Sequence, residues 1–386
     1  MFRRMAMLAA LTTALLGLWP GAAQAWPGGA RAAGGVQAIA AGKLHTCAVT
    51  STGAVKCWGA GGDGQLGNGA RANAARPVQV AGLTSGVRVL ASGGRHTCAV
   101  TAAGAVKCWG DNGYGQLGTG TTTSTTKPVQ VAGLTSGVTA LAAGTDFTCA
   151  VLGSGAVSCW GRNHRGQLGT GTTTDVRRPT PVVGLTRGVT AVAAGDAHAC
   201  AVVSGSVKCW GFNLNGQLGN GTAVAASRPV QVVGLTSGVA GVSAGYAGTC
   251  AVTTAGAVNC WGWATTVGSG TTRDAFTPVQ VRGLTSGVRE LGFGWFHACA
   301  VTGTGAARCW GYNTTYQLGV TGGASLTPTQ VTGLSSGVVQ ITAGWGHSCA
   351  RTTTGVVKCW GYNADGQLGA GSTGAQSATP VTVAGL

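Results

Sequence analysis

The chain has 386 residues, of which 44% are hydrophobic and only 8% charged, and it contains 71 glycines and 14 cysteines. Its 24 basic residues outnumber 8 acidic ones, which gives a formal net charge of +16. Because Val, Leu, Ala and Cys recur at fixed positions that can build a core, the composition excludes a low-complexity disordered chain. The positive balance favours acidic partners and carries no information on the fold.

Residues 1–25 have the features of a secretory signal peptide. Two arginines precede an apolar run over residues 5–19, and an Ala-Gln-Ala cleavage site ends at Ala25. This run is shorter than the roughly 20 residues that span a bilayer. We therefore expect cleavage near Ala25, a short linker over residues 26–35, and export of a mature chain without a membrane span to the periplasm or the extracellular space.

The cysteines repeat with a fixed period along the rest of the chain. Because the first cysteine of each pair recurs at steps of 49 to 51 residues, seven units fill residues 36–386. Periods of about 40 to 50 residues are typical of propellers and solenoids. The seven pairs are Cys47 and Cys57, Cys98 and Cys108, Cys149 and Cys159, Cys200 and Cys209, Cys250 and Cys260, Cys299 and Cys309, and Cys349 and Cys359.

Each unit contains four short runs with the alternation, the Thr and Val content and the bounding glycines of β-strands. In the second unit these runs are VRVLAS, TCAVT, AVKCW and PVQV. Four antiparallel strands repeated seven times predict an all-β, seven-bladed β-propeller of about 50 residues per repeat. An open solenoid is the alternative, but it needs atypical capping units, and the first and last units resemble the middle ones. The sequence leaves open whether each blade begins with the VQAIAAG-type strand or with the PVQV-type strand.

The repeated motif has the form V-x-x-[IL]-A-A-G-x-x-H-T-C-A-V-T-x-x-G-x-V-K-C-W-G-x-N-x-x-G-Q-L-G, and it resembles the repeat of the regulator of chromosome condensation family. The resemblance covers residues 36–386, and segments such as WGDNGYGQLG at 109–118 carry it most specifically. It implies a seven-bladed propeller but no single function. The family includes a nuclear exchange factor for a small GTPase and a plant UV-B photoreceptor, and a similar secreted bacterial propeller inhibits β-lactamases. The function therefore has to be argued from a site.

The two cysteines of each unit face each other across a predicted hairpin. If residues 51–53 form a three-residue turn, Cys47 lies opposite Cys57 at a non-hydrogen-bonded site with Cα atoms roughly 4.5 Å apart, which a disulfide tolerates. In the fourth unit the pair is one residue closer, but the missing residue falls in the turn and the register survives. Paired cysteines in an exported chain predict seven hairpin disulfides.

Zinc binding is the alternative for the Cys and His residues, because His45 and Cys47 face the same side of one strand. It would require seven four-ligand sites, and two units have Phe147 and Gly248 in place of the histidine, so no metal site is predicted. We expect the histidines to hydrogen-bond neighbouring backbone. The tryptophan after each second cysteine points to the opposite blade face and is expected to pack between blades.

In a four-stranded antiparallel blade, alternate connections emerge on the same side. The turn before each histidine and the loop after each Trp-Gly therefore share one face, and the residues that vary between units concentrate there. One arc of this face is basic and the other aromatic, and Trp, Tyr and Arg are common interface anchors. The predicted binding residues are Tyr246, Trp263, Trp295, Phe296, Tyr312, Trp345, Tyr362, Phe212, Arg95, Arg162 and Arg165.

The fifth unit departs most from the motif. It has WGWATTVGSG where other units have W-G-x-N-x-x-G-Q-L-G, and it lacks the histidine. Either the unit has drifted without consequence, or it forms a remodelled surface centred on Trp263 with Tyr246 and Trp295.

These observations favour a secreted, non-enzymatic propeller that binds a protein or an acidic cell-envelope polymer through its aromatic and basic loops. We expect a monomer, no cofactor and no nucleic-acid partner. A hydrolase or lyase with its site in the central channel is one alternative, although the 8 acidic residues offer no close carboxylate pair. A guanine-nucleotide exchange role, as the family resemblance implies for eukaryotic members, is another and conflicts with export.

Overall fold

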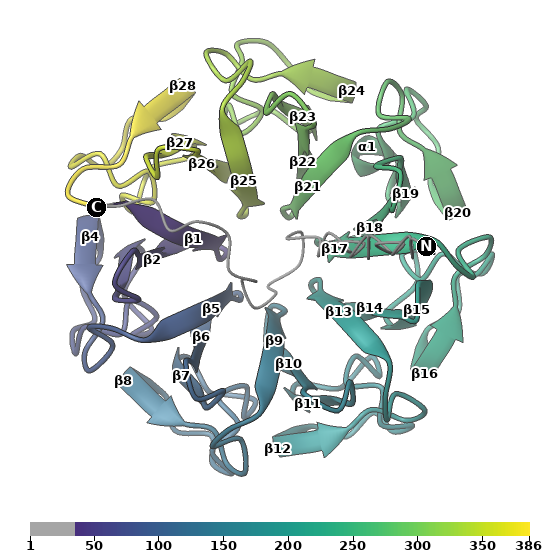
Figure 1. Ribbon diagram of the computed structural model, residues 1–386, viewed down its shortest axis with the longest axis horizontal. Helices are drawn as coiled ribbons and strands as arrows, with labels where there is room; N and C mark the ends of the chain where they lie inside the picture. Colours follow the sequence, from purple (N-terminus) through teal and green to yellow (C-terminus); the bar gives the residue numbers. More distant parts are fainter. Residues whose placement is uncertain (1–34) are drawn as a thin grey trace, which may run out of the picture.

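A computed structural model describes residues 35–386 and arranges them as seven four-stranded antiparallel sheets around a central axis (Figure 1). The predicted all-β, seven-bladed propeller is therefore confirmed, with one short helix, α1 (Ala264–Val267), as an addition. The predicted signal peptide over residues 1–25 and nearly all of the linker lie outside the described residues. Within the described part, no helix is long and apolar enough to cross a bilayer.

Blade 1 consists of β1 to β4, and each later blade takes the next four strands. The innermost strands are β1 (Val36–Ala41), β5 (Val87–Ser92), β9 (Val138–Ala143), β13 (Val189–Ala194), β17 (Val239–Ala244), β21 (Val288–Phe293) and β25 (Val338–Ala343). The second strands are β2 (His45–Thr50), β6 (His96–Thr101), β10 (Phe147–Leu152), β14 (His198–Val203), β18 (Gly248–Thr253), β22 (His297–Thr302) and β26 (His347–Thr352). The third strands are β3 (Val55–Gly59), β7 (Val106–Gly110), β11 (Val157–Gly161), β15 (Ser206–Gly211), β19 (Val258–Gly262), β23 (Ala307–Gly311) and β27 (Val357–Gly361). The outer strands are β4 (Ala74–Gln79), β8 (Thr125–Gln130), β12 (Val176–Pro181), β16 (Ala226–Gln231), β20 (Ala275–Gln280), β24 (Ser325–Gln330) and β28 (Ser377–Thr382).

Every blade is complete in sequence order, from its inner strand to its outer strand. This decides between the two arrangements that the sequence leaves open. The first blade begins with β1, and β28 pairs with β27 of its own blade instead of crossing to blade 1. Within residues 35–386 no strand is shared between blades 7 and 1, so the ring closes through contacts between these two blades.

The predicted disulfides are present in all seven blades, and none of the described cysteines is free. Cys47 pairs directly with Cys57 in the hairpin register, and the Cα atoms of the seven pairs lie 4.0 to 4.1 Å apart. In blade 4 the shorter turn places Ser204 and Gly205 at positive φ, and Cys200 still faces Cys209. Seven disulfides indicate an oxidising compartment, and they leave no thiolate to serve as a zinc ligand.

The tryptophan after each second cysteine is fully buried and joins two blades. The indole Nε1–H of Trp109 donates a 2.9 Å hydrogen bond to the carbonyl oxygen of Gln65 in the preceding blade, and its ring packs against the disulfide of that blade. The same bond occurs at every junction, at 2.8 to 2.9 Å. At the closing junction, Trp58 donates to Gln367 of blade 7. The predicted packing of these rings between blades is confirmed.

The histidines bond side chains of the next blade, so the expected bonds to neighbouring backbone are wrong. His45 Nε2 lies 2.9 Å from Thr97 Oγ1, and the Thr97 hydroxyl donates to the carbonyl oxygen of Gln65. Because the hydroxyl proton goes to that carbonyl, the imidazole carries its proton on Nε2 and donates to the hydroxyl. Five junctions contain this pair of bonds, from His45, His96, His198, His297 and His347.

At two junctions the histidine and the hydroxyl that it would bond are both absent. Phe147 and Ala199 occupy the two positions at the junction of blades 3 and 4, and Gly248 and Ala298 occupy them at the junction of blades 5 and 6. No hydroxyl is therefore left without its histidine. In blade 5 the vacated space is filled, because a Cβ on Gly248 would lie 2.6 Å from Thr266 Oγ1 and 2.8 Å from the Phe293 ring.

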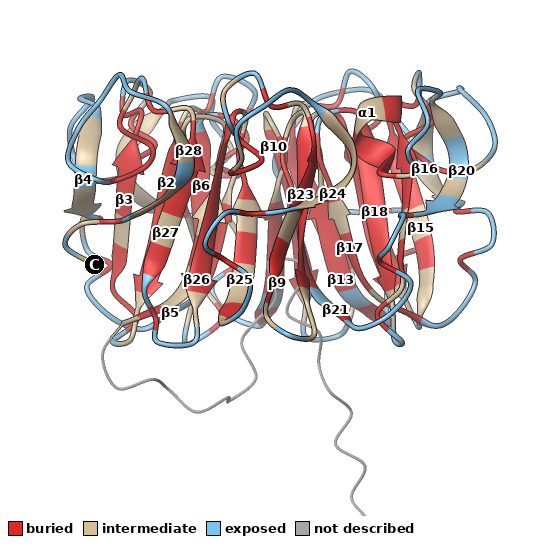
Figure 2. Cartoon of the chain, turned by 90° about the horizontal axis from the view of Figure 1, so that it is seen from above, coloured by how far each residue is buried: buried red, intermediate tan, exposed pale blue. Residues whose placement is uncertain are grey.

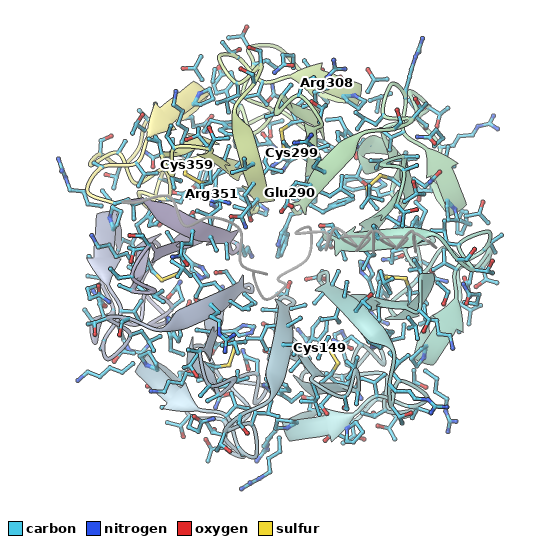
Figure 3. All side chains as sticks on the ribbon, viewed as in Figure 1. Cys149, Glu290, Cys299, Arg308, Arg351 and Cys359 are labelled. Carbon is cyan, nitrogen blue, oxygen red and sulfur yellow. A yellow bond between two sulfur atoms is a disulfide. The ribbon has the colours of Figure 1, made fainter. Side chains whose placement is uncertain are left out.

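The closing junction has polar contacts of its own. Gln340 of β25 accepts from the backbone N–H of Ile39 at 3.1 Å and donates to the carbonyl oxygen of Ile39 at 3.2 Å. Arg351 donates to the same amide from β26, and Glu290 of β21 lies near it towards the centre of the ring (Figure 3). Burial raises the pKa of the Glu290 carboxyl well above its ordinary value, and the charge of Arg351 opposes this shift.

The turns divide between two faces of the ring. The turn before each histidine and the loop after each Trp-Gly lie on one side, which we call the loop face, and the hairpin tips and blade-to-blade turns lie on the other. Figure 2 shows buried strands between two exposed rims, with α1 on the rim of the loop face. The predicted sharing of faces is confirmed.

The disulfides give a mass prediction. We expect the intact mass of the exported protein, measured without reductant, to be lower than the mass after reduction by 14 hydrogens, because all 14 cysteines are paired. A smaller difference, or alkylation of unreduced protein by iodoacetamide, would show that some bridges are absent.

The buried histidines predict acid sensitivity. Burial lowers the pKa of His45, His198 and His297 from 6.5 to about 3, and that of His96 and His347 to about 4. Between pH 6.5 and these values the unfolded chain binds more protons than the folded one. The free energy of unfolding should therefore fall as the pH is lowered through this window, by about 1.4 kcal/mol for each unit of pKa difference per histidine.

The chain provides a control for this effect. The double variant His198→Phe with Thr249→Ala copies the natural pair Phe147 and Ala199. Denaturant unfolding at several pH values should show a shallower loss of stability for the variant than for the parent protein. Identical pH profiles would contradict the assignment of this loss to the histidines.

Candidate functional site

The two variable positions of each blade are neighbours on the loop face. The backbone N–H of the residue after Trp-Gly donates to the carbonyl oxygen of the residue before the histidine position, as Tyr312 does to Phe296 at 2.9 Å. Equivalent bonds, from Ala60, Asp111, Arg162, Phe212, Trp263 and Tyr362, occur in the other six blades at 2.8 to 3.0 Å. A repeated backbone bond therefore brings the most variable side chains of each blade together.

Five of the predicted aromatic residues form one continuous group, which we call the aromatic cluster. Its members come from blades 5 and 6 and are Tyr246, Trp263, Trp295, Phe296 and Tyr312. The rings of Tyr246 and Trp295 are stacked with centroids 5.1 Å apart, and Trp263 lies 5.7 Å from Phe296 and 5.4 Å from Tyr312. Each ring is partly exposed. Such pairs add stability beyond their buried area and also hold the exposed edges in fixed positions.

A cavity of about 310 Å³ opens beside this cluster, and we call it the aromatic pocket. It lies between the aromatic cluster and Trp345 of blade 7. Its lining consists of Trp263, Phe296, Tyr312, Thr314, Thr315, Gln317, Trp345 and Gly346. Its size is at the lower end of ligand sites, roughly 300 to 1,000 Å³, and its mostly aromatic walls with a few polar groups are typical of them.

Gln317 supplies a polar group to this pocket. Its side chain is 2% exposed, and its Oε1 accepts a 2.9 Å hydrogen bond from the backbone N–H of Thr315. Within the described chain, its Nε2 has no hydrogen-bond partner, so the amide N–H group is available to an occupant. The Thr315 hydroxyl lies 2.9 Å from the carbonyl oxygen of Gly346 and ties the pocket floor to blade 7.

The remodelled fifth unit forms one wall of the pocket. Helix α1 replaces the usual loop, and Asp274 Oδ1 accepts a 2.9 Å bond from the N–H of Ala264 at its start. The carbonyl oxygen of Thr266 takes over from the usual glutamine as acceptor for Trp310. The junction bond is kept, and Trp263 lies against Phe296.

The structure separates the predicted arginines from the aromatic cluster. Arg95 lies 3.7 Å from Asp63, and Arg162 lies 3.1 Å from Asp146. Burial raises the pKa of the Asp146 carboxyl, and Arg162 opposes this shift.

Several arginine and aromatic side chains instead pair locally. Arg162 covers the ring of Tyr114 at 4.5 Å, and Arg165 covers Phe212 at 5.1 Å. Trp345 packs against Tyr362 at 5.4 Å. The Arg162 and Arg165 side chains therefore already have partners within the chain. Phe212 lies in the basic arc of the loop face.

Sequence reasoning missed four lining residues, Thr314, Thr315, Gln317 and Gly346. Gln317 belongs to the invariable part of the repeat, where it resembles a purely structural residue. The signal that could have found it is Tyr316, which replaces a glycine of the motif. Tyr316 has a φ of 60°, a left-handed conformation that is costly for a residue with a side chain.

The channel mouth on the loop face is narrow. One glycine from each blade lies against a backbone carbonyl oxygen of the next blade. A Cβ on any of these glycines would lie 2.0 to 2.6 Å from that oxygen. The cavity there has a volume of about 70 Å³, and its lining residues with polar side chains are Lys43, Ser92, Thr145, Asp196 and Trp295. No cluster of metal-ligating side chains occurs among the residues that the structure describes.

Comparison with protein families identifies the repeat. Two models of the regulator of chromosome condensation (RCC1) repeat match the chain, one at residues 52–100, 103–151, 154–202, 204–252 and 305–351, the other at residues 36–65, 87–116, 138–167, 288–317 and 338–367. The chain belongs to this family. The matched segments leave out residues 253–287, which contain Trp263 and α1.

Individual relatives match part of the chain. A segment of 170 residues is 38% identical to the human E3 ubiquitin-protein ligase HERC2, over 42% of this chain and 4% of that protein. A segment of 168 residues is 35% identical to the Arabidopsis thaliana ultraviolet-B receptor UVR8, over 42% of this chain and 38% of the receptor. The chain thus spans well under two thirds of these relatives.

Solved structures share the propeller. Prp20p from Saccharomyces cerevisiae has a TM-score of 0.76 at 20% identity, over 91% of this chain and 88% of that one. Human WBSCR16 has a TM-score of 0.72 at 23% identity, over 82% and 87%. At these identities the likeness establishes the fold alone.

The left-handed conformation of Tyr316 gives a stability prediction. The variant Tyr316→Gly should raise the free energy of unfolding by about 1 kcal/mol, because glycine adopts this φ without steric cost. Denaturant unfolding measures the change. The matched control is Tyr114→Gly, which changes an equally exposed tyrosine at ordinary φ and should lower stability. A loss of stability in both variants would contradict the prediction.

Proposed function

We propose that this protein is a secreted, non-enzymatic binding propeller that recognises another protein through the aromatic pocket of its loop face. The observation that carries the proposal is the pocket itself, a cavity of about 310 Å³ with four aromatic walls and an amide donor. Partly exposed aromatic side chains held by their neighbours lose little entropy on binding, and Trp and Tyr dominate interface energetics.

The chemistry of the pocket favours a protein over the acidic polymer as its occupant. Its lining residues are aromatic or uncharged, and Lys43 lies at 4.5 Å over the ring of Trp295, a member of the cluster that does not line the pocket. Arg95 and Arg162 already face carboxylates. An apolar or aromatic side chain of a partner, with a carbonyl oxygen that accepts from Gln317, matches what the pocket offers.

The relatives support a binding role. The structure of Prp20p is described together with binding properties to Gsp1p and histones. A guanine-nucleotide exchange role is less well supported, because the seven disulfides favour an oxidising compartment and the expected signal peptide favours export. A hydrolase or lyase site in the channel is less well supported, because the mouth contributes a single carboxylate, Asp196, among its described lining residues.

The double variant Trp263→Ala with Trp345→Ala should lose partner binding. It removes two walls of the pocket, and we expect the affinity for the partner to fall by more than about tenfold. Immobilised mature protein is used to capture partners from secreted and envelope fractions, and the affinity of each purified partner is then measured for the parent and variant proteins.

The control is the double variant Tyr114→Ala with Phe212→Ala, which removes two aromatic rings from the basic arc of the same face. It should bind as the parent protein does. If every purified partner binds the pocket variant with unchanged affinity, the aromatic pocket is not the recognition site.

A further inference from the structure

Charge is distributed unequally around the ring. Blades 1 and 2 each contain four basic residues and one acidic residue, and blade 3 contains five and two, so each of these blades has a net charge of +3. Blades 4 to 7 each contain two basic residues and one acidic residue, for a net charge of +1. The basic side of the ring therefore differs from the side that holds the aromatic pocket.

Four of the basic residues occupy the same position on consecutive outer strands, and we call them the basic row. Each is the exposed residue that precedes the proline of its strand, with a threonine in its place on β20, β24 and β28. The members are Arg76 on β4, Lys127 on β8, Arg178 on β12 and Arg228 on β16. In Figure 1 these strands follow one another along the outer wall of the ring.

A repeated backbone contact fixes the height of the row. In each case a glycine N–H of the preceding blade donates to the carbonyl oxygen of the residue just before the basic one, as Gly120 does to Arg177 at 2.9 Å. The basic side chain then lies against that glycine, and a Cβ on Gly120 would fall 2.7 Å from the guanidinium of Arg178. The row is therefore a set of cations at one level, each placed at a junction between blades.

The charges of the row are not neutralised. Two ion pairs, Arg95 with Asp63 and Arg162 with Asp146, both lie on the loop face, away from the row. None of the four cations has a carboxylate within 4 Å among the described residues. Charged residues and prolines also protect sheet edges from pairing. Edge protection does not explain the row, because three of the seven edges have threonine instead.

The shape of the wall selects the kind of partner. The four outer strands face different directions around a convex wall (Figure 1), so a flat bilayer or a stiff nucleic-acid duplex, whose persistence length is about 150 base pairs, cannot meet all four cations. A flexible linear polyanion can follow the arc. Single-stranded nucleic acids are bound with aromatic stacking platforms, and the row's strands β4, β8, β12 and β16 contain no aromatic residue.

We propose that the basic row binds an anionic polysaccharide that runs along the outer wall across blades 1 to 4. This surface is separate from the aromatic pocket, so both partners can be bound at once. Carboxylate or sulfate groups on successive sugars contact the cations of the row, and one such group can take the place of another. The affinity comes from several weak contacts along one polysaccharide chain.

The test measures binding of heparin and of polygalacturonate to the mature protein. The variant in which all four cations become threonine, R76T/K127T/R178T/R228T, copies the residue of blades 5 to 7 and should bind at least about tenfold more weakly, with a smaller dependence of affinity on salt. Heparin fragments of increasing length should bind the parent protein with increasing affinity until they span the row.

A matched control distinguishes an effect of the basic row from an effect of the net charge of the protein. The variant R273T/R282T/R289T/K358N removes the same charge from blades 5 to 7 and should bind nearly as the parent protein does. Equal loss in both variants, or equal binding of disaccharides and long chains, would overturn the proposal. So would tighter binding of anionic vesicles or of an oligothymidylate than of either polysaccharide. Changes in the aromatic pocket should leave polysaccharide binding unchanged, so the two proposals fail independently.

Discussion

The indole N–H of one blade meets a carbonyl oxygen of the blade before it seven times, and the ring depends on this bond. Each bond is made by a fully buried indole whose ring packs beside a disulfide, as Trp109 does beside Cys47 and Cys57, and an unpaired indole or carbonyl group would be costly there. Blade 5 shows what the constraint requires. Its usual loop is replaced by α1, but Thr266 presents its carbonyl oxygen to Trp310 as the glutamines do elsewhere. The position of a backbone acceptor is fixed, and the side chains around it are free to change.

Much of this fold could be predicted from spacing within one unit. The period of the cysteines, the alternation of the strands and the hairpin register are all local, and the structure agrees with each of them. The missing turn residue near Ser204 tested the register in the sequence, and the pairing of Cys200 with Cys209 is retained.

What could not be predicted depends on the relation between neighbouring blades. The partner of His45 is a hydroxyl on the next blade, and the partner of Arg95 is Asp63 on the preceding one. These contacts depend on the offset between neighbouring blades, and the period of the sequence gives no information on that offset. The aromatic residues of the candidate site could be named, because they differ between units. Gln317 was missed because it is the same in nearly every unit, and the cavity that it lines beside Trp345 is formed in part by side chains of other blades.

The hairpin disulfides also bear on how the chain matures. Each cysteine has its partner nine or ten residues away, whereas the next cysteine along the chain is about four times farther. Loop-closure entropy alone then favours the native bridge over its nearest competitor by about 1 kcal/mol. As the chain emerges into an oxidising compartment, each bridge can form before the following unit arrives. A polypeptide with 14 cysteines thereby avoids most of the mispairing that would otherwise require an isomerase to correct.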